Sequence, residues 1–204
     1  NLAEVDVPKA MDGSPFLGKG VTASDLNARD EAFGYADRFD EKYDFVRTYR
    51  KGKYKYIRNY QPFNFDGLFN QYRYRMLAYE EWRDLYHAGK LNTAQRQFFE
   101  PRPVEGLYDI DADPHEVKDL SADPEYARVL KDLRRRLARK VKSLPDLSFL
   151  PEPVMLAEAM DNPVDYGQVN RKRIQKLVDV SDLSLQPFSK ARGRIEKALA
   201  SKDP

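Results

Sequence analysis

Cysteine is absent from the 204 residues of this chain, and histidine occurs only twice. The absence of cysteine excludes disulfides, thiolate metal ligands and a cysteine nucleophile within the chain. His87 and His115 are not at metal-ligand spacing, and neither belongs to an HExxH pattern. A glycine-rich phosphate loop and a GxSxG nucleophile elbow are missing as well. By itself, the sequence therefore presents no convincing catalytic set.

A large excess of charge of one sign is also absent. The chain has 35 Lys and Arg residues against 33 Asp and Glu residues, so its formal net charge is +2. Attraction to an anionic polymer must then come from local clusters of cations, and nucleic-acid binding is not favoured for the chain as a whole. No apolar run approaches the roughly 20 residues needed to cross a bilayer, so we expect no membrane contact.

Aromatic residues are plentiful, with 13 Tyr and 11 Phe, and supply much of the possible core. Residues 31–60 alternate with period 2 and are rich in Tyr, Phe and Val, which predicts β-strands. Lys51 and Gly52 lie midway in this segment, and glycine at the second position of a turn favours a tight hairpin.

The stretch YDFVRTYRKGKYKYIRNY, residues 43–60, contains six basic and six aromatic residues. Strand alternation puts the six rings on one face of the hairpin: Tyr43, Phe45, Tyr49, Tyr54, Tyr56 and Tyr60. We expect these rings to form cross-strand pairs beneath a long helix. Lys51, Lys53 and Lys55 then lie at the turn and on the more solvent-exposed side of the hairpin. The stretch is therefore predicted to serve mainly as part of the structural core and only secondarily as a contact surface.

Apolar spacing and breaker residues predict the remaining elements. They are helices over 72–87 and 93–99 (with Thr93 as N-cap), a strand over 106–110, a long helix from Ser121 or Asp123 to about Leu144, an extended connector over 145–153, and helices over 169–180 and 188–200. We therefore predict an α+β fold: a small antiparallel β-sheet of about four strands, packed by a long C-terminal helix, with a helical tail. The arginine run of the long helix, residues 134–139, is interpreted as a solvated helix face.

The acidic turn after the last predicted strand was tested as a calcium loop. Asp109, Asp111 and Asp113 alternate as the first ligands of such a loop do. However, Pro114 stands where glycine is required, and Leu120 stands where the bidentate glutamate is required. These carboxylates are instead expected to cap and solvate a turn.

The phrase LYDIDADPHEVKDLSADPEY, residues 107–126, follows the hairpin and resembles the C-terminal region of the alkaline-phosphatase-like, formylglycine-dependent sulfatases. In that family a strand pair similar to VRTYRKGKYKYI precedes a strand and turn of the form LYDLxxDPxExxNL and then a long helix. The matching residues are Leu107, Tyr108, Asp109, Asp113, Pro114, Glu116 and Leu120. Asp119 departs from the pattern, because asparagine is commoner there. The opening VDVPKAMDGSPFLG, with Val7-Pro8 and Met11-Asp12-Gly13, also resembles the segment that leaves the family's catalytic domain, so the resemblance covers about residues 1–150.

The resemblance implies a parent enzyme that is a sulfuric ester hydrolase. Such enzymes use a formylglycine, made from the Cys or Ser of a C/S-x-P-x-R motif, beside a calcium ion in a larger N-terminal α/β domain. No Ser of this chain begins that motif, because Ser14 and Ser143 lack the arginine or the spacing. We therefore expect no catalytic or metal-binding residues here and no activity of the chain alone. The implied partners are the catalytic domain and its sulfated carbohydrate, such as a polysaccharide or glycosaminoglycan, and the implied location is periplasmic or secreted.

The same resemblance predicts three parts. Residues 1–30 would connect to the catalytic domain, residues 31–150 would form the sulfatase C-terminal subdomain, and residues 151–204 would form a linker and a helical, HEAT-like extension. The predicted helix pair near the end of the chain is the unit from which such extensions are built.

The polar turn before the hairpin is the predicted substrate-binding segment, with Arg38, Asp37 and Asp40 as its residues. A guanidinium fork suits a sulfate or carboxylate group of a sugar. The alternative is that Arg38 forms an ion pair with Asp37, Asp40 or Asp44. Two other functions stay open: a non-catalytic module that binds anionic polysaccharide or nucleic acid through the basic hairpin and the arginine helix, and a scaffold that uses the terminal helices.

Overall fold

The computed structural model describes residues 5, 11, 13–39 and 41–201. Val7, Pro8 and Asp12 of the family resemblance, and Asp40 of the predicted binding segment, lie outside the described residues. Within the part of the predicted connecting segment (residues 1–30) that the structure describes, α1 (Ala23–Asn27) is a short helix that Thr22 caps.

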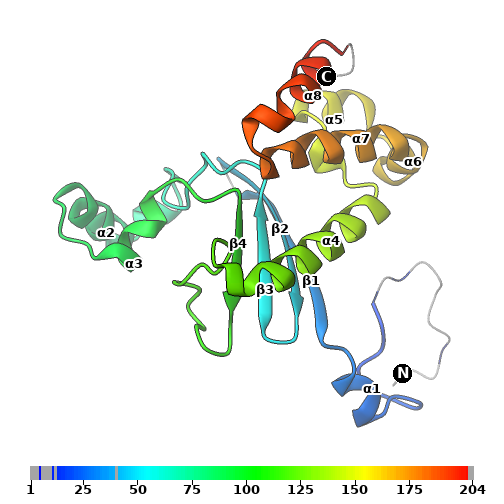
Figure 1. The fold of residues 1–204 in the computed structure, drawn as a ribbon, viewed down its shortest axis with the longest axis horizontal. Coiled ribbons are helices and arrows are strands. Elements are labelled where there is room, and N and C mark those ends of the chain that lie inside the picture. The colour runs from blue at the N-terminus through cyan, green and yellow to red at the C-terminus, as the bar shows by residue number, and fades with distance from the viewer. Residues whose placement is uncertain (1–4, 6–10, 12, 40, 202–204) are drawn as a thin grey trace.

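A four-stranded antiparallel sheet forms the centre of the described chain (Figure 1). Its strands are β1 (Glu31–Phe39), β2 (Lys42–Lys51), β3 (Tyr54–Asn59) and β4 (Glu105–Asp109), and they lie side by side in chain order. The β2–β3 turn consists of Gly52 and Lys53, because Lys51 pairs with Tyr54. Gly52 has a φ of +54° and is thus the first turn residue, not the second as predicted.

A β-bulge interrupts the pairing of β1 with β2. Asp37 lies opposite both Asp44 and Phe45, because the register passes from Ala36↔Val46 to Arg38↔Tyr43. Phe45 adopts a φ of +55°, a strained conformation for a residue with a side chain. Its buried ring stacks on Tyr60 at 4.7 Å between ring centroids and contacts Phe149 edge-on at 4.8 Å. This packing offsets the strain.

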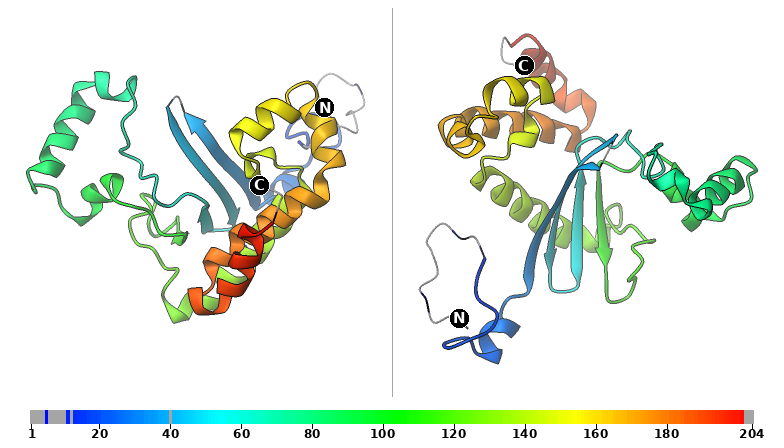
Figure 2. Two further views of the ribbon diagram at one scale, coloured as in Figure 1. Left: turned by 90° about the horizontal axis from the view of Figure 1, so that it is seen from above. Right: turned by 180° about the vertical axis from the view of Figure 1, so that it is seen from behind.

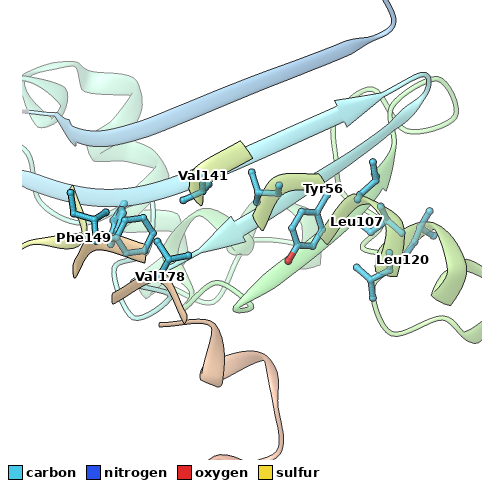
Figure 3. Close-up of a cluster of buried hydrophobic side chains, with 11 residues drawn as sticks. Tyr56, Leu107, Leu120, Val141, Phe149 and Val178 are labelled. Carbon is cyan, nitrogen blue, oxygen red and sulfur yellow. The ribbon is translucent and has the colours of Figure 1, made fainter. Parts of the chain in front are cut away.

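The long helix α4 (Ala127–Ser143) covers one face of the sheet. Asp123 caps the preceding 3₁₀ turn η3 (Pro124–Tyr126). The buried α4 residues Leu130, Leu133, Leu137 and Val141 belong to the core, where Figure 3 shows Val141. All six rings of the 43–60 stretch lie in this core or pack against it. The predicted fold class and the predicted role of the rings are therefore confirmed.

The segment after α4 is folded rather than extended, contrary to the prediction for 145–153. It contains the 3₁₀ turn η4 (Leu147–Phe149) and the start of helix α5 (Glu152–Glu158). Phe149 and Leu150 are buried, so tertiary packing decides the conformation of this segment. Pro153 lies in the first turn of α5, where a missing N–H costs no hydrogen bond.

The tail packs onto the same core as the sheet and α4. After α6 (Pro163–Val169), helix α7 (Arg171–Ser181) contributes the buried side chains of Ile174 and Val178. The 3₁₀ turn η5 (Asp182–Leu185) and helix α8 (Phe188–Leu199) follow. The predicted terminal helices are thus confirmed, whereas α5 and α6 were not predicted. The division into three domains stays a prediction.

An arm between β3 and β4 projects sideways from the sheet, away from the tail (Figures 1 and 2). It contains the 3₁₀ turn η1 (Arg73–Arg75), helices α2 (Leu77–His87) and α3 (Thr93–Arg96), and the 3₁₀ turn η2 (Gln97–Phe99). Asn92, not Thr93, caps α3. Trp82, Phe98 and Phe99 form a separate aromatic cluster, with Trp82 stacked on Phe98 at 4.4 Å. None of the described helices is both long and apolar enough to span a bilayer.

Candidate functional site

A polar surface hollow of about 450 Å³ lies at the tip of the β1–β2 hairpin, where the arm passes beside it. Arg38, Glu41, Gln71, Tyr72 and Arg75 line it. It therefore combines the end of β1 with the residues around η1, which are more than 30 positions away in the sequence.

Asn70 joins the two sides of this hollow. Its side chain is fully buried, donates to a carboxylate oxygen of Glu41 at 3.0 Å, and accepts from the backbone N–H of Arg73 at 2.8 Å. A buried amide with both of its groups satisfied holds its neighbours in a defined geometry. Asn70 thereby fixes η1, and with it Tyr72 and Arg75, against the hairpin tip.

Arg38 lines the hollow, as the predicted binding role requires. Its side chain is 53% exposed and forms an ion pair with Glu152 in the first turn of α5, 114 residues further along the chain. The alternative named Asp37, Asp40 or Asp44 as the ion-pair partner of Arg38. Asp40 lies outside the described residues, and the other two carboxylates pair with other arginines. Asp37 accepts from Arg47 at 2.7 Å, and Asp44 lies 2.5 Å from Arg102.

Tyr72, Gln71 and Arg75 were not predicted as site residues, because residues 72–87 were assigned to one helix. The helix begins only at Leu77, and QYRYR, residues 71–75, precedes it and contributes Gln71, Tyr72 and Arg75 to the hollow. Tyr72 is 63% exposed. The alternation of rings and cations in QYRYR, the same signal that marks the 43–60 hairpin, was the feature that could have identified it.

Two guanidinium groups, an amide and an exposed ring suit the binding of an anionic sugar. Arginine donates in a fork that matches sulfate or carboxylate oxygens. An exposed tyrosine ring offers an apolar face with a polar edge. Glu41 is the one carboxylate among the lining residues, and Asn70 already donates to it.

Two buried arginines of the hairpin do not line this hollow but stabilise the fold. Arg47 and Arg58 are each 2% exposed on the helix-covered side of the sheet. Arg47 donates to Asp146 at 2.8 Å and 2.9 Å, and also to Asp37. Burial lowers the pKa of Arg47, but its hydrogen bonds to Asp146 and Asp37 outweigh burial and raise the pKa above its ordinary value. Arg47 therefore stays charged and bound.

The lysines of the hairpin are also paired with carboxylates. Lys51 lies 2.9 Å from Glu31. Lys53 lies 2.6 Å from Asp109, and Lys55 lies 2.6 Å from Glu116. The basic appearance of residues 43–60 is thus largely neutralised within the fold.

The sheet face opposite α4 lines a second hollow, of about 620 Å³. Its lining has two cations, Lys55 and Arg102, against five carboxylates: Asp44, Asp66, Glu100, Glu116 and Asp119. Burial, aided by nearby carboxylates, raises the pKa of Tyr108 in its wall to about 12. This hollow therefore has no excess of positive charge with which to attract an anion.

The carboxylates of the 109–119 turn hold the backbone, as predicted. Asp113 accepts from the N–H of Lys118 at 2.7 Å, and Asp119 accepts from the N–H groups of Leu107 at 3.0 Å and Ser121 at 2.8 Å. Across the residues that the structure describes, no three His, Cys, Asp or Glu side chains are grouped so that they could hold a metal ion.

The structure thus defines a class: a small α+β unit in which a helix covers one face of an antiparallel sheet and a polar hollow lies at the tip of one hairpin. No protein-family profile matches the chain. It is similar to an ulvan-active sulfatase of Formosa agariphila, with 38% identity over 149 residues, which are 72% of this chain and 24% of that protein. The chain is therefore homologous to part of a sulfatase, and the resemblance seen in the sequence is confirmed. It spans about a quarter of the length of that relative, consistent with the C-terminal region of a sulfatase.

Proposed function

We propose that the chain is the C-terminal subdomain of a sulfatase, a sulfuric ester hydrolase that acts on sulfated sugars or polysaccharides. The observation that carries the proposal is the 38% identity across most of this chain but only 24% of the sulfatase relative. The remaining part of such a protein supplies the partner, an N-terminal catalytic domain with formylglycine and calcium. A relative named for its activity on ulvan supports a polymeric carbohydrate substrate and a periplasmic or secreted location.

The isolated chain should not hydrolyse sulfate esters. We expect no release of sulfate from an aryl sulfate or from a sulfated polysaccharide, because the sequence contains no C-x-P-x-R or S-x-P-x-R motif. The same measurement on a longer protein, with such a motif upstream of Asn1, should give turnover. Sulfate release by the isolated chain, or an open upstream frame without the motif, would contradict the proposal.

Within the parent enzyme, the hollow beside Arg38 is proposed to form part of the rim of the substrate cleft. Arg38 and Arg75 would bind sulfate or carboxylate groups of the sugar, and Tyr72 would stack against a ring. The exposure of Arg38 and Tyr72 supports this role. Asp37 would act indirectly through its ion pair with Arg47 beside the bulge. Asp40 lies outside the described residues and keeps its place in the proposal.

Changing Arg38 to Gln in the longer enzyme should raise KM for a sulfated polymer by roughly ten-fold or more, because a charged hydrogen bond to the substrate is lost. The value of kcat should change little, since the group binds ground state and transition state alike. A small aryl sulfate that does not reach the rim should keep its KM.

The matched control is Arg192→Gln, which removes another exposed arginine that pairs with a glutamate, Glu196, at 2.7 Å. Its KM for the polymer should stay within two-fold of the unmodified enzyme, about 0.4 kcal/mol. An unchanged KM in Arg38→Gln, or an equal rise in the control, would remove Arg38 from the proposed rim.

A further inference from the structure

The outer face of α4 carries a row of four exposed cations. Arg128, Lys131, Arg135 and Arg139 follow each other at intervals of three, four and four residues. At about 100° per residue these intervals keep the side chains on one face of a helix. That face is opposite to Leu133 and Leu137, which point into the core. The helix lies in front of the sheet in Figure 1, so this face is turned to solvent.

Most of these cations lack the partners that other basic residues have. Among the residues that the structure describes, no carboxylate lies within ion-pair distance of Arg128, Lys131 or Arg139. Arg135 contacts Asp132, which lies 2.7 Å from Arg136 as well.

The remaining arginines of the run are paired within the fold. Arg134 lies 2.5 Å from Glu105, and Arg136 lies 2.8 Å from Glu31. The α4 row, defined as Arg128, Lys131, Arg135 and Arg139, is therefore a local excess of positive charge on a nearly neutral protein. The earlier interpretation of the arginine run as one solvated face applies only to part of it.

The spacing of the α4 row suits a linear polyanion. From Arg128 to Arg139 the helix rises on the order of 17 Å, at 1.5 Å per residue. A row of separated charges matches a chain that carries an anion on successive units, better than it matches one small anion. A single small anion is better bound by converging donors, as in the hollow beside Arg38.

The absence of exposed aromatic rings on α4 helps to distinguish between two possible ligands, a single-stranded nucleic acid and a sulfated polysaccharide. Proteins that bind single-stranded nucleic acid combine cations with aromatic rings on which the bases stack. Among the described residues, the strongly exposed rings are Phe16, Tyr35, Phe63, Phe69, Tyr72 and Phe188, and none of them belongs to α4. Tyr54 and Tyr126, near the start of the helix, pack against each other at 6.2 Å. The row thus offers charge without base stacking, which favours a sulfated polysaccharide.

We propose that the α4 row is a second carbohydrate-binding surface, which holds a sulfated polysaccharide by its repeated anionic groups. It lies on the helix face and not at the hollow beside Arg38, so it would retain the polymer between successive encounters with the cleft. The choice of polymer rests on the proposed sulfatase function. The binding itself depends only on the residues of this chain.

The test measures binding of the complete 204-residue chain to dextran sulfate, with neutral dextran as the uncharged equivalent. A triple variant, Arg128→Gln, Lys131→Gln and Arg139→Gln, should lose at least ten-fold in affinity at about 50–100 mM salt. The slope of log affinity against log salt concentration should become shallower by about 2, at roughly 0.7 per lost contact. All three changes are on the surface, so the far-UV circular dichroism and the urea midpoint should stay unchanged.

The matched control removes the same charge from the paired hairpin lysines: Lys51→Gln, Lys53→Gln and Lys55→Gln. It should lose less than about three-fold in affinity, because these lysines are neutralised by carboxylates. An equal loss in both variants would show that only net charge matters and would overturn the proposal.

Two other results would overturn it. One is equal binding to neutral dextran, and the other is tighter, α4-dependent binding to a single-stranded oligonucleotide, which would assign the row to nucleic acid. Because the readout is binding and not turnover, a failure here leaves the proposed sulfatase function standing. Conversely, failure of the parent to release sulfate leaves the binding result unchanged.

Discussion

Replacing Arg58 by methionine should lower the free energy of unfolding by about 3–5 kcal/mol. The guanidinium is 2% exposed and stacks over Tyr60, with 4.5 Å from its central carbon to the ring centroid. Its acceptors are the backbone oxygens of Asn59, Val104 and Ser181, the hydroxyl of Ser184 and the carboxylate of Asp182. Methionine fills much of the volume but removes all five of these donations. Of the acceptors, the Val104 and Ser181 oxygens keep another donor, the N–H of Asn59 and the hydroxyl of Ser184.

The partly buried carboxylate of Asp182 adds to this loss. Burial raises its pKa above the usual value, and the charge of Arg58 partly opposes the rise. Without Arg58 the pKa rises further. A raised pKa in the folded state means that stability is full below the ordinary pKa of 3.8 and declines as the pH passes through the folded value. The deficit of Arg58→Met should therefore be larger at pH 7 than at pH 3.

Urea unfolding at both pH values measures this deficit, and the thermal midpoint at pH 7 should fall on the order of 10 °C for a chain of this size. The control is Arg192→Met, since Arg192 and Glu196 are 66% and 59% exposed. Its unfolding free energy should change by less than about 0.5 kcal/mol. Equal stability of the two variants would mean that Arg58 does not join the sheet to the tail.

The sheet and α4 were predictable because their signals are local. Rings at every second position identify the strands that hold Tyr43 and Tyr56. Apolar residues at helical spacing, such as Leu133 and Leu137, identify α4 and its buried face. Both patterns arise from the geometry of the element itself, so no distant contact is needed to recognise them.

The 145–153 segment was not predictable in the same way. PDLSFLPEP has one proline at its start, two near its end and no helical period, which favours an extended connector. Phe149 packs edge-on against Phe45 and Tyr60, both about 100 residues earlier in the chain. A tertiary contact of this kind overrides the local conformational preference of the segment, and it cannot be recognised from a short stretch of sequence.

The candidate site shows the same division. Arg38 was found from its chemistry and its place in a polar turn, but its partner Glu152 could not be, because only the fold brings α5 to the hairpin tip. Tyr72 and Arg75 were missed because the helix was started five residues too early. Helix boundaries depend on caps, and Met76 at the N-cap of α2 makes no side-chain hydrogen bond that could mark the start.

The basic hairpin therefore has at least two kinds of cation with different roles. Arg47 and Arg58 are buried and bind the segments after α4. The lysines at the turn pair with nearby carboxylates. Strand alternation alone cannot separate these roles, because Arg47 shares its face with the ring of Tyr49. The distinction comes from which carboxylates and carbonyls the tail brings to that face.

The tail was predicted as an extension outside the subdomain, and a single substitution in α7 tests whether it is. Ile174 is 1% exposed and belongs to the same core cluster as Tyr56 and Leu137. Changing Ile174 to Ala should lower the free energy of unfolding by about 2–5 kcal/mol, because apolar burial is lost and a cavity remains. The drop should appear in one cooperative transition that also unfolds the sheet.

Val180→Ala on the same helix is the control. Val180 is 40% exposed, so this substitution removes a smaller group that is already partly in contact with water. It should cost less than about 1 kcal/mol. Side chains of α7 also bind the last carbonyls of α4: Arg171 donates to Ser143 at 2.7 Å, and Gln175 donates to Lys142 at 2.9 Å. Loosening α7 should thus expose the end of α4 as well. A separate early transition confined to the tail would instead show that residues 151–204 fold as an independent unit.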